Sequence, residues 1–127
     1  MKPSARKVWV KKIVAKWRPR LFLGEWHIDI VYAKVQPENS NVYAECKSSS
    51  AYLEADIYIY PNFWKMNSDR WEHTLVHEMA HCLTSATSKL LTDALSGTIH
   101  PQTSIDFHLE QLTQRIANVA FQQEWPE

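Results

Sequence analysis

Apolar residues recur at the spacing of an α-helix in three segments of this 127-residue chain. The first segment runs from about Ser4 to Arg18, and Pro19 is expected to end it. The second covers about Ser68–Thr84 and the third about Thr103–Gln123. The third has the cleanest apolar stripe, formed by Ile105, Leu109, Leu112, Ile116, Val119 and Ala120.

Three segments between the first two helices have the alternation and the β-branched or aromatic content of strands: Trp26–Tyr32, Val42–Lys47 and Tyr52–Tyr60. In the first of them His27 and Asp29 face away from the apolar side chains, so His27 is expected on the solvent side. Ser48–Ser50 is expected to form a polar hairpin connection.

The segment between the last two helices, residues 85–104, is rich in Ser and Thr and predicts a loop with a short helix at Lys89–Leu95. The order helix, three strands, helix, loop, helix predicts an α+β fold with a small, three-stranded, mainly antiparallel sheet. A chain of this length fits one domain, which we expect to span residues 1–127.

The second predicted helix contains the sequence His77-Glu78-Met79-Ala80-His81. Two histidines four residues apart lie on one helix face, so both imidazoles can reach one metal ion. Glu78 is rotated by about 100° from His77. It can therefore lie beside the open position of the metal and accept a proton from a bound water. This is the logic of the H-E-x-x-H motif of zinc metalloproteases.

An ordinary helix with core or surface histidines is the alternative interpretation of these five residues. The flanking residues argue against core histidines, because an apolar arc lies on the side away from both: Trp71, Leu75, Met79, Cys82 and Leu83. His73 precedes His77 by four residues, but Thr74 follows it and cannot act as a carboxylate base. We therefore expect His73 to be an exposed neighbour, with a substrate-facing role as the alternative.

A catalytic zinc site needs a third protein ligand. The motif is not followed by the extended H-E-x-x-H-x-x-G-x-x-H arrangement, so this ligand must come from further along the chain. Glu110 is favoured, because it lies on the flank of the last helix and can reach a metal held against the preceding one. His100 is the best histidine candidate. Asp106, one turn before Glu110, and His108, on the opposite flank, stay open as well.

The net charge is zero, but residues 1–20 hold eight of the fourteen basic side chains and no acidic one. Such a helix either docks on the acidic remainder of its own domain, which we favour, or binds nucleic acid. No apolar run is long enough for a membrane span, and no signal peptide is visible. Two cysteines, Cys46 and Cys82, are too few for a disulfide framework, so we expect both to be reduced in a cytoplasmic protein.

The layout resembles the minimal form of the zincin family of metallopeptidases. It is similar to short metallopeptidase-like proteins of phages and bacteria and, more distantly, to minigluzincins and SprT-like proteins. The shared pieces are an N-terminal helix, a sheet ending in Asp56–Tyr60, the run Leu75–His81 and a closing helix with Glu110. The resemblance covers nearly the whole chain, and its specific part is the H-E-x-x-H core.

In gluzincin-type members of this family the third ligand is a glutamate on the following helix, which matches Glu110. In SprT-like members it is a histidine in a His-Gly setting, which His100-Pro101 does not reproduce. The two cysteines also cannot make the accessory zinc ribbon of those members. The resemblance therefore favours the glutamate.

Motif and resemblance together imply a zinc-dependent metallopeptidase in which His77, His81 and Glu110 hold Zn²⁺ and Glu78 is the general base. By resemblance, the strand around 53–60 would be the sheet edge that pairs with an extended peptide or protein substrate. Candidate donors to the oxyanion are Tyr58, Tyr60, His100 and His108. The alternatives are a non-catalytic zinc-binding or partner-binding domain on the same scaffold, and a nucleic-acid-associated, SprT-like protease.

Overall fold

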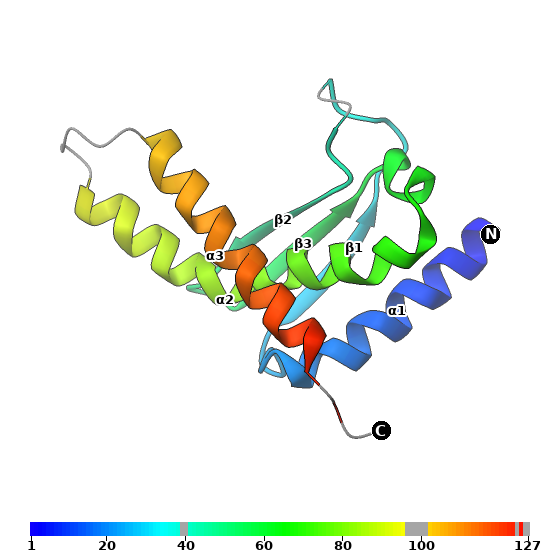
Figure 1. Cartoon of the computed structure of the whole chain (residues 1–127), viewed down its shortest axis with the longest axis horizontal. Coiled ribbons are helices and arrows are strands. Elements are labelled where there is room, and N and C mark those ends of the chain that lie inside the picture. Colours follow the sequence, from blue (N-terminus) through cyan, green and yellow to red (C-terminus); the bar gives the residue numbers. More distant parts are fainter. Residues whose placement is uncertain (39–40, 96–101, 124, 126–127) are drawn as a thin grey trace.

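The computed structural model describes residues 1–38, 41–95, 102–123 and 125, and for residues 86–95, 102–105, 107 and 108 it describes the backbone alone. A three-stranded sheet lies behind helices α2 and α3, and α1 packs beside them at the N-terminal end of the chain (Figure 1). The fold is α+β, as the order of the predicted elements indicated.

The sheet consists of β1 (His27–Tyr32), β2 (Ala44–Ser49) and β3 (Glu54–Ile59) in the order β1-β3-β2. β1 pairs with β3 in parallel and β2 pairs with β3 antiparallel, so the sheet is mixed and the prediction of a mainly antiparallel sheet was wrong. The alternation within β1 is confirmed, and His27 lies on the solvent side with 73% of its side chain exposed.

The strand expected at the sheet edge, β3, is the central one, and the edge beside α2 is β2. The strong strand pattern of β3 marks its central position, because Ala55, Ile57 and Ile59 are fully buried while both neighbours complete its hydrogen bonds. An edge strand carries a weaker pattern, and β2 is correspondingly rich in polar residues. Ser48 and Ser49 belong to β2, where they pair with Ala55 and Glu54, and not to the hairpin connection.

α1 (Pro3–Arg20) continues past Pro19, contrary to the predicted end. Proline removes the hydrogen bond to the carbonyl four residues earlier, but one residue before the helix end this costs little, and the Leu21 N–H still bonds to the Trp17 carbonyl at 3.0 Å. The chain turns instead at Phe22, which adopts a left-handed conformation with φ 56°.

Two short 3-10 helices, η1 (Pro61–Lys65) and η2 (Ser68–Arg70), lead from the sheet into α2 (Trp71–Leu95). α2 does not end at Thr84, and the segment expected to be a loop with a short helix is, up to Leu95, a continuation of α2. Ser and Thr cost a helix only a few tenths of a kcal/mol each, so their number did not break it. α3 (Gln102–Gln122) matches its prediction within one residue at each end.

α2 packs against β2 and β3, and α1 and α3 both pack against α2. Their buried side chains form one cluster with the inward residues of β3, which includes Val10, Ile13, Val14, Trp17, Ala55, Ile57, Ile59, Leu75, Met79, Cys82 and Ala117. The apolar arc of α2 is buried or half-buried as predicted except for Leu83, which is 39% exposed. This packing leaves the opposite flank of α2, with its two histidines, between β2 and α3.

Two basic side chains of α1, those of Lys16 and Arg18, bond to the elements that follow it. Glu72 of α2 accepts hydrogen bonds from Lys16 Nζ at 2.7 Å and from Trp17 Nε1 at 2.8 Å. Arg18 donates to the Trp26 carbonyl at 2.7 Å. Three consecutive residues of α1 are thereby tied to the elements that follow it. Among the described helices none is long and apolar enough to cross a membrane.

Candidate metal centre

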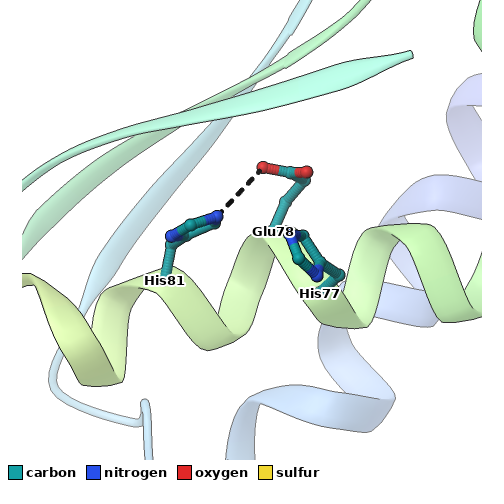
Figure 2. A group of neighbouring side chains, drawn as sticks. All are labelled: His77, Glu78 and His81. Atoms are coloured by element: carbon teal, nitrogen blue, oxygen red, sulfur yellow. Dashed lines mark ion pairs between the residues drawn. The ribbon is translucent and has the colours of Figure 1, made fainter. Parts of the chain in front are cut away.

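His77, Glu78 and His81 project from the middle of α2 as one group, with one ligand atom of each within 4.8 Å of the others (Figure 2). The two imidazole rings lie on the same flank of the helix, with centroids 5.0 Å apart and planes at 83°. Both histidines are half-buried, so neither is a core residue. The i, i+4 spacing has therefore produced the face that the sequence predicted.

Glu110 of α3 lies against both histidines. Its two carboxylate oxygens are 3.2 Å from His77 Nε2 and 2.9 Å from His81 Nε2. The carboxylate thus bridges the nitrogens that a metal would need, although 56% of the Glu110 side chain is exposed. The residue favoured from sequence as the third ligand is the one that the fold brings to this point.

A buried pair of hydroxyls sets the register between α2 and α3. The Thr84 and Thr113 hydroxyl oxygens lie 3.0 Å apart and share one hydrogen bond. Each hydroxyl also lies within hydrogen-bond distance of a carbonyl in its own helix, that of His81 at 3.3 Å for Thr84 and that of Leu109 at 2.8 Å for Thr113. Thr84 is 4% exposed and Thr113 is fully buried. Because Thr84 lies close to His81 on α2, and Thr113 one turn beyond Glu110 on α3, this contact holds Glu110 opposite His81.

Glu78 points from α2 toward the sheet and is only 7% exposed. One of its oxygens lies 4.0 Å from His81 Nε2. Burial raises the pKa of the Glu78 carboxyl to about 7, against the positive charge of the histidines and a hydrogen bond from the backbone of Cys46 in β2. A carboxyl with a pKa near neutrality can both accept and return a proton.

The pKa shifts of His77 and Glu110 reflect the contact between them. Burial works to lower the pKa of His77, but its hydrogen bond to Glu110 and the nearby Glu78 and Glu110 charges outweigh burial and raise it. Hydrogen bonds from His77 and His81 hold the pKa of Glu110 well below its usual range. Glu110 is therefore a carboxylate at neutral pH, as a metal ligand must be.

The clustered donors could hold a metal ion. Two imidazole nitrogens and one carboxylate, with a further position open to water, form the ligand set of one common class of catalytic zinc site. His77 Nδ1 is buried and has no hydrogen-bond partner among the described residues. A metal-bound histidine usually donates from its second nitrogen, and Gln114 of α3 lies beside the His77 ring, where it contributes to the raised pKa.

Two cavities flank the candidate centre and follow the edge strand β2. One has a volume of about 390 Å³ and is lined by the start of β2, the first two turns of α2, and Gln114. The other has a volume of about 570 Å³ and lies further along both elements, beside Cys46, His81, Thr84 and Glu110. His77 and Glu78 line the first cavity and His81 the second, so the candidate centre lies between them.

Of the alternative third ligands, Asp106 has a described side chain. Asp106 is exposed on α3 and lines the second cavity, one turn from Glu110. His100 lies outside the described residues, and so does the side chain of His108.

The two tyrosines considered as oxyanion donors are engaged elsewhere. Tyr60 donates to Glu45 at 2.9 Å, and Tyr58 stacks on Tyr60 and lies under the Lys47 ammonium. Tyr58 alternates with the buried residues of β3, so it points away from α2.

His73 is half-buried, not exposed as expected. Its ring stacks on Phe121 with centroids 5.0 Å apart, lies 3.4 Å from the Gln114 amide nitrogen, and lines the first cavity. Sequence reasoning missed Arg70 and Gln114, which line the same cavity. Helical spacing could have indicated both residues. Arg70 precedes His77 by two turns and Gln114 follows Glu110 by one turn, so each lies on the same face as a predicted site residue.

No protein-family profile matches the chain, and no curated protein or solved structure shows significant similarity to it.

Proposed function

We propose that this protein is a zinc-dependent metallopeptidase. The observation that carries the proposal is the convergence of His77 Nε2 and His81 Nε2 on the Glu110 carboxylate, with buried Glu78 beside them. Three such donors match a catalytic zinc site that keeps one position open, and the resemblance to minimal zincins agrees with this set.

Within this proposal, Glu78 is the general base. Bound zinc would supply Lewis acidity, which polarises a scissile carbonyl and lowers the pKa of a water toward about 7. Glu78 accepts the proton of the attacking water and then gives it to the leaving amine. A pKa of about 7 suits both transfers near neutral pH. The half-buried position of the histidines between β2 and α3 limits the access of bulk water to the reacting groups.

The substrate in this proposal is an extended polypeptide that pairs with β2. β2 is the edge strand and runs alongside the motif on α2, so its outer backbone groups are available to a further strand. This corrects the expected pairing strand while keeping the expected substrate class. The two cavities along β2 would take side chains on either side of the bond that is cleaved.

Zinc stoichiometry and peptide hydrolysis test the proposal together. We expect about one zinc per wild-type chain in elemental analysis and cleavage of unfolded protein or of a mixed peptide library. The Glu78→Gln variant should keep its zinc and lose roughly 100- to 10,000-fold in rate, because a general base contributes that much. Hydrolysis that survives this substitution contradicts the mechanism. Zinc binding without hydrolysis of any peptide would instead leave a non-catalytic zinc-binding domain.

A further inference from the structure

The cavity that begins at His77 and Glu78 ends at an arginine. Arg70, in η2, lines its far end together with the polar side chains of Asn41, His73, Thr74 and Gln114. Arg70 is exposed, and among the described residues its guanidinium has no ion-pair or hydrogen-bond partner; only its backbone groups bond, to Asn67 and Thr74. Apart from Glu78, the described residues of the lining include no acidic one.

The second cavity has the opposite charge. The described residues of its lining include Asp106 and Glu110 and no lysine or arginine. We call the two cavities together the groove along β2. The groove is therefore positive at its Arg70 end and negative beyond His81. A peptide lying in the groove experiences this difference along its length, so the groove favours one direction and one placement of substrate charge.

The direction in which a peptide pairs with β2 decides which of its ends reaches Arg70. β2 and α2 run in the same direction, because Ala44 lines the first cavity with His77 whereas Ser48 lines the second with His81. A peptide paired antiparallel to β2 runs the opposite way. Its residues before the cleaved bond then lie in the second cavity and those after it lie in the first. The negatively charged C-terminal end of a peptide is thereby directed toward Arg70.

We propose that the cavity ending at Arg70 is a carboxylate-binding subsite for the part of the substrate that follows the cleaved bond. This inference rests on the proposed peptidase function and names its substrate class. The carboxylate comes either from an acidic side chain or from the free C-terminus of a peptide. Arg70, whose guanidinium has no other partner among the described residues, provides the charge-assisted hydrogen bonds.

Helix geometry sets the position of this carboxylate. Arg70 precedes His77 by two helical turns, roughly 10 Å along the axis. An extended peptide advances about 3.4 Å per residue. The arginine side chain can extend toward the candidate centre, which shortens the distance that the peptide has to span. The carboxylate therefore belongs to the second or third residue after the cleaved bond.

Binding of three peptide pools tests the subsite, with Glu78→Gln protein loaded with zinc so that no pool is consumed. All pools are N-acetylated peptides of mixed composition. One is amidated and carries glutamate near its C-terminal end, one is amidated with glutamine there, and one has glutamine and a free C-terminal carboxylate. We expect the pools with a carboxylate to bind about fivefold more tightly in calorimetric titrations, the size of one exposed ion pair. The carboxylate pool with the larger increase in affinity over the amidated glutamine pool identifies the source of the carboxylate.

Substitutions assign the preference to Arg70. Arg70→Ala should abolish it, and Arg70→Glu should reverse it toward a pool with lysine at the same position. Arg115→Ala is the matched control, because Arg115 is exposed on α3 and lines a different cavity. This control should keep the preference for carboxylates. Equal binding of all pools, no binding of any, or a preference that survives Arg70→Ala overturns the proposal.

Zinc content and hydrolysis by the wild-type protein separate this inference from the proposed function. Hydrolysis of both amidated pools at equal rates keeps the peptidase and overturns the subsite. An Arg70-dependent preference in a protein that hydrolyses nothing keeps the carboxylate site and overturns the peptidase.

Discussion

His81 Nε2 lies 2.9 Å from a carboxylate oxygen of Glu110, which joins the second half of the H-E-x-x-H motif to the last helix of the chain. The contact pairs a half-buried ring with a side chain that is 56% exposed, so burial of Glu110 does not account for it. The second oxygen of the same carboxylate meets His77. Because the carboxylate lies between the two imidazoles, His77, His81 and Glu110 are positioned to bind one metal ion together.

Removal of the Glu110 carboxylate should therefore weaken zinc binding. We expect Glu110→Ala to lower the zinc affinity by more than the roughly 10- to 100-fold that substitutions of the partners of metal ligands cause. The measurement is a competition titration with a chromophoric chelator, supported by elemental analysis.

Asp106→Ala is the matched control, since Asp106 lies one turn earlier on α3 and is also exposed. It should bind zinc like the wild type. A loss of zinc in the Asp106 variant with retention in the Glu110 variant would assign the third ligand to Asp106. Retention in both would direct attention to His100.

The pKa shifts predict how the stability of the zinc-free protein depends on pH. The pKa of Glu78 is raised from 4.5 to about 7 in the folded protein, so the folded state keeps a proton that the unfolded chain releases in this range. The free energy of unfolding should therefore fall as the pH rises from about 4.5 to about 7. The raised pKa of His77 makes the free energy of unfolding fall further at pH values above 6.5, the ordinary pKa of histidine. The lowered pKa of Glu110 acts in the opposite sense and removes stability only as the pH falls below about 4.5.

Urea unfolding in the presence of a chelator checks this dependence between about pH 5 and pH 8. We expect the Glu78→Gln variant to show a flatter profile, with the remaining slope due to His77. Excess zinc should reverse the trend, because metal binding requires deprotonated ligands. A wild-type profile that rises toward pH 8 without metal would show that Glu78 is not protonated in the folded protein.

The sequence predicted those features that depend on local periodicity. The 3.6-residue repeat gives the face shared by His77 and His81, and the phase of the α3 stripe gives the flank that carries Glu110. Each of these is determined by residues within a few turns, so no knowledge of the remaining chain is needed. The burial of Leu75 and Met79 on the opposite side of α2 follows from the same repeat.

Features that depend on contacts between distant segments were not predicted. The parallel pairing of β1 with β3 joins two strands that β2 separates in the sequence, and no local pattern gives the direction in which they pair. The cavity at Arg70 requires β2, α2 and α3 to meet, which the sequence of one element cannot indicate. His73 is half-buried for the same reason, because Phe121 comes from α3.

The anchoring of α1 predicts an asymmetry between two substitutions at Glu72 and Lys16. Glu72→Ala leaves the Nε1 donor of Trp17 without its acceptor, and Trp17 is only 2% exposed. We expect this variant to lose about 1–3 kcal/mol of unfolding free energy, the cost of an unsatisfied buried donor. Lys16→Ala removes a partly exposed ion pair and should cost less than about 1 kcal/mol. Equal losses in urea unfolding would mean that the ion pair, and not the indole hydrogen bond, fastens α1.

The hydroxyl pair of Thr84 and Thr113 should couple the stability of the α2–α3 contact to the metal centre. Either single valine substitution removes the hydrogen bond between the helices, while the remaining hydroxyl keeps the carbonyl of its own helix, so each should cost about 1 kcal/mol of unfolding free energy. The double variant replaces both partners by apolar groups of the same shape, so it should be less destabilised than the sum of the two single variants.

A double-mutant cycle in urea measures this coupling, and zinc titration of the same four proteins measures its effect on the site. Thr113→Val should also weaken zinc binding, because α3 loses the contact that holds Glu110 opposite His81. Ser85→Ala is the control, since the Ser85 hydroxyl bonds only within α2, to the Cys82 carbonyl. Additive losses of unfolding free energy, with zinc affinity unchanged in all variants, would show that the register of the two helices is set by their apolar packing alone.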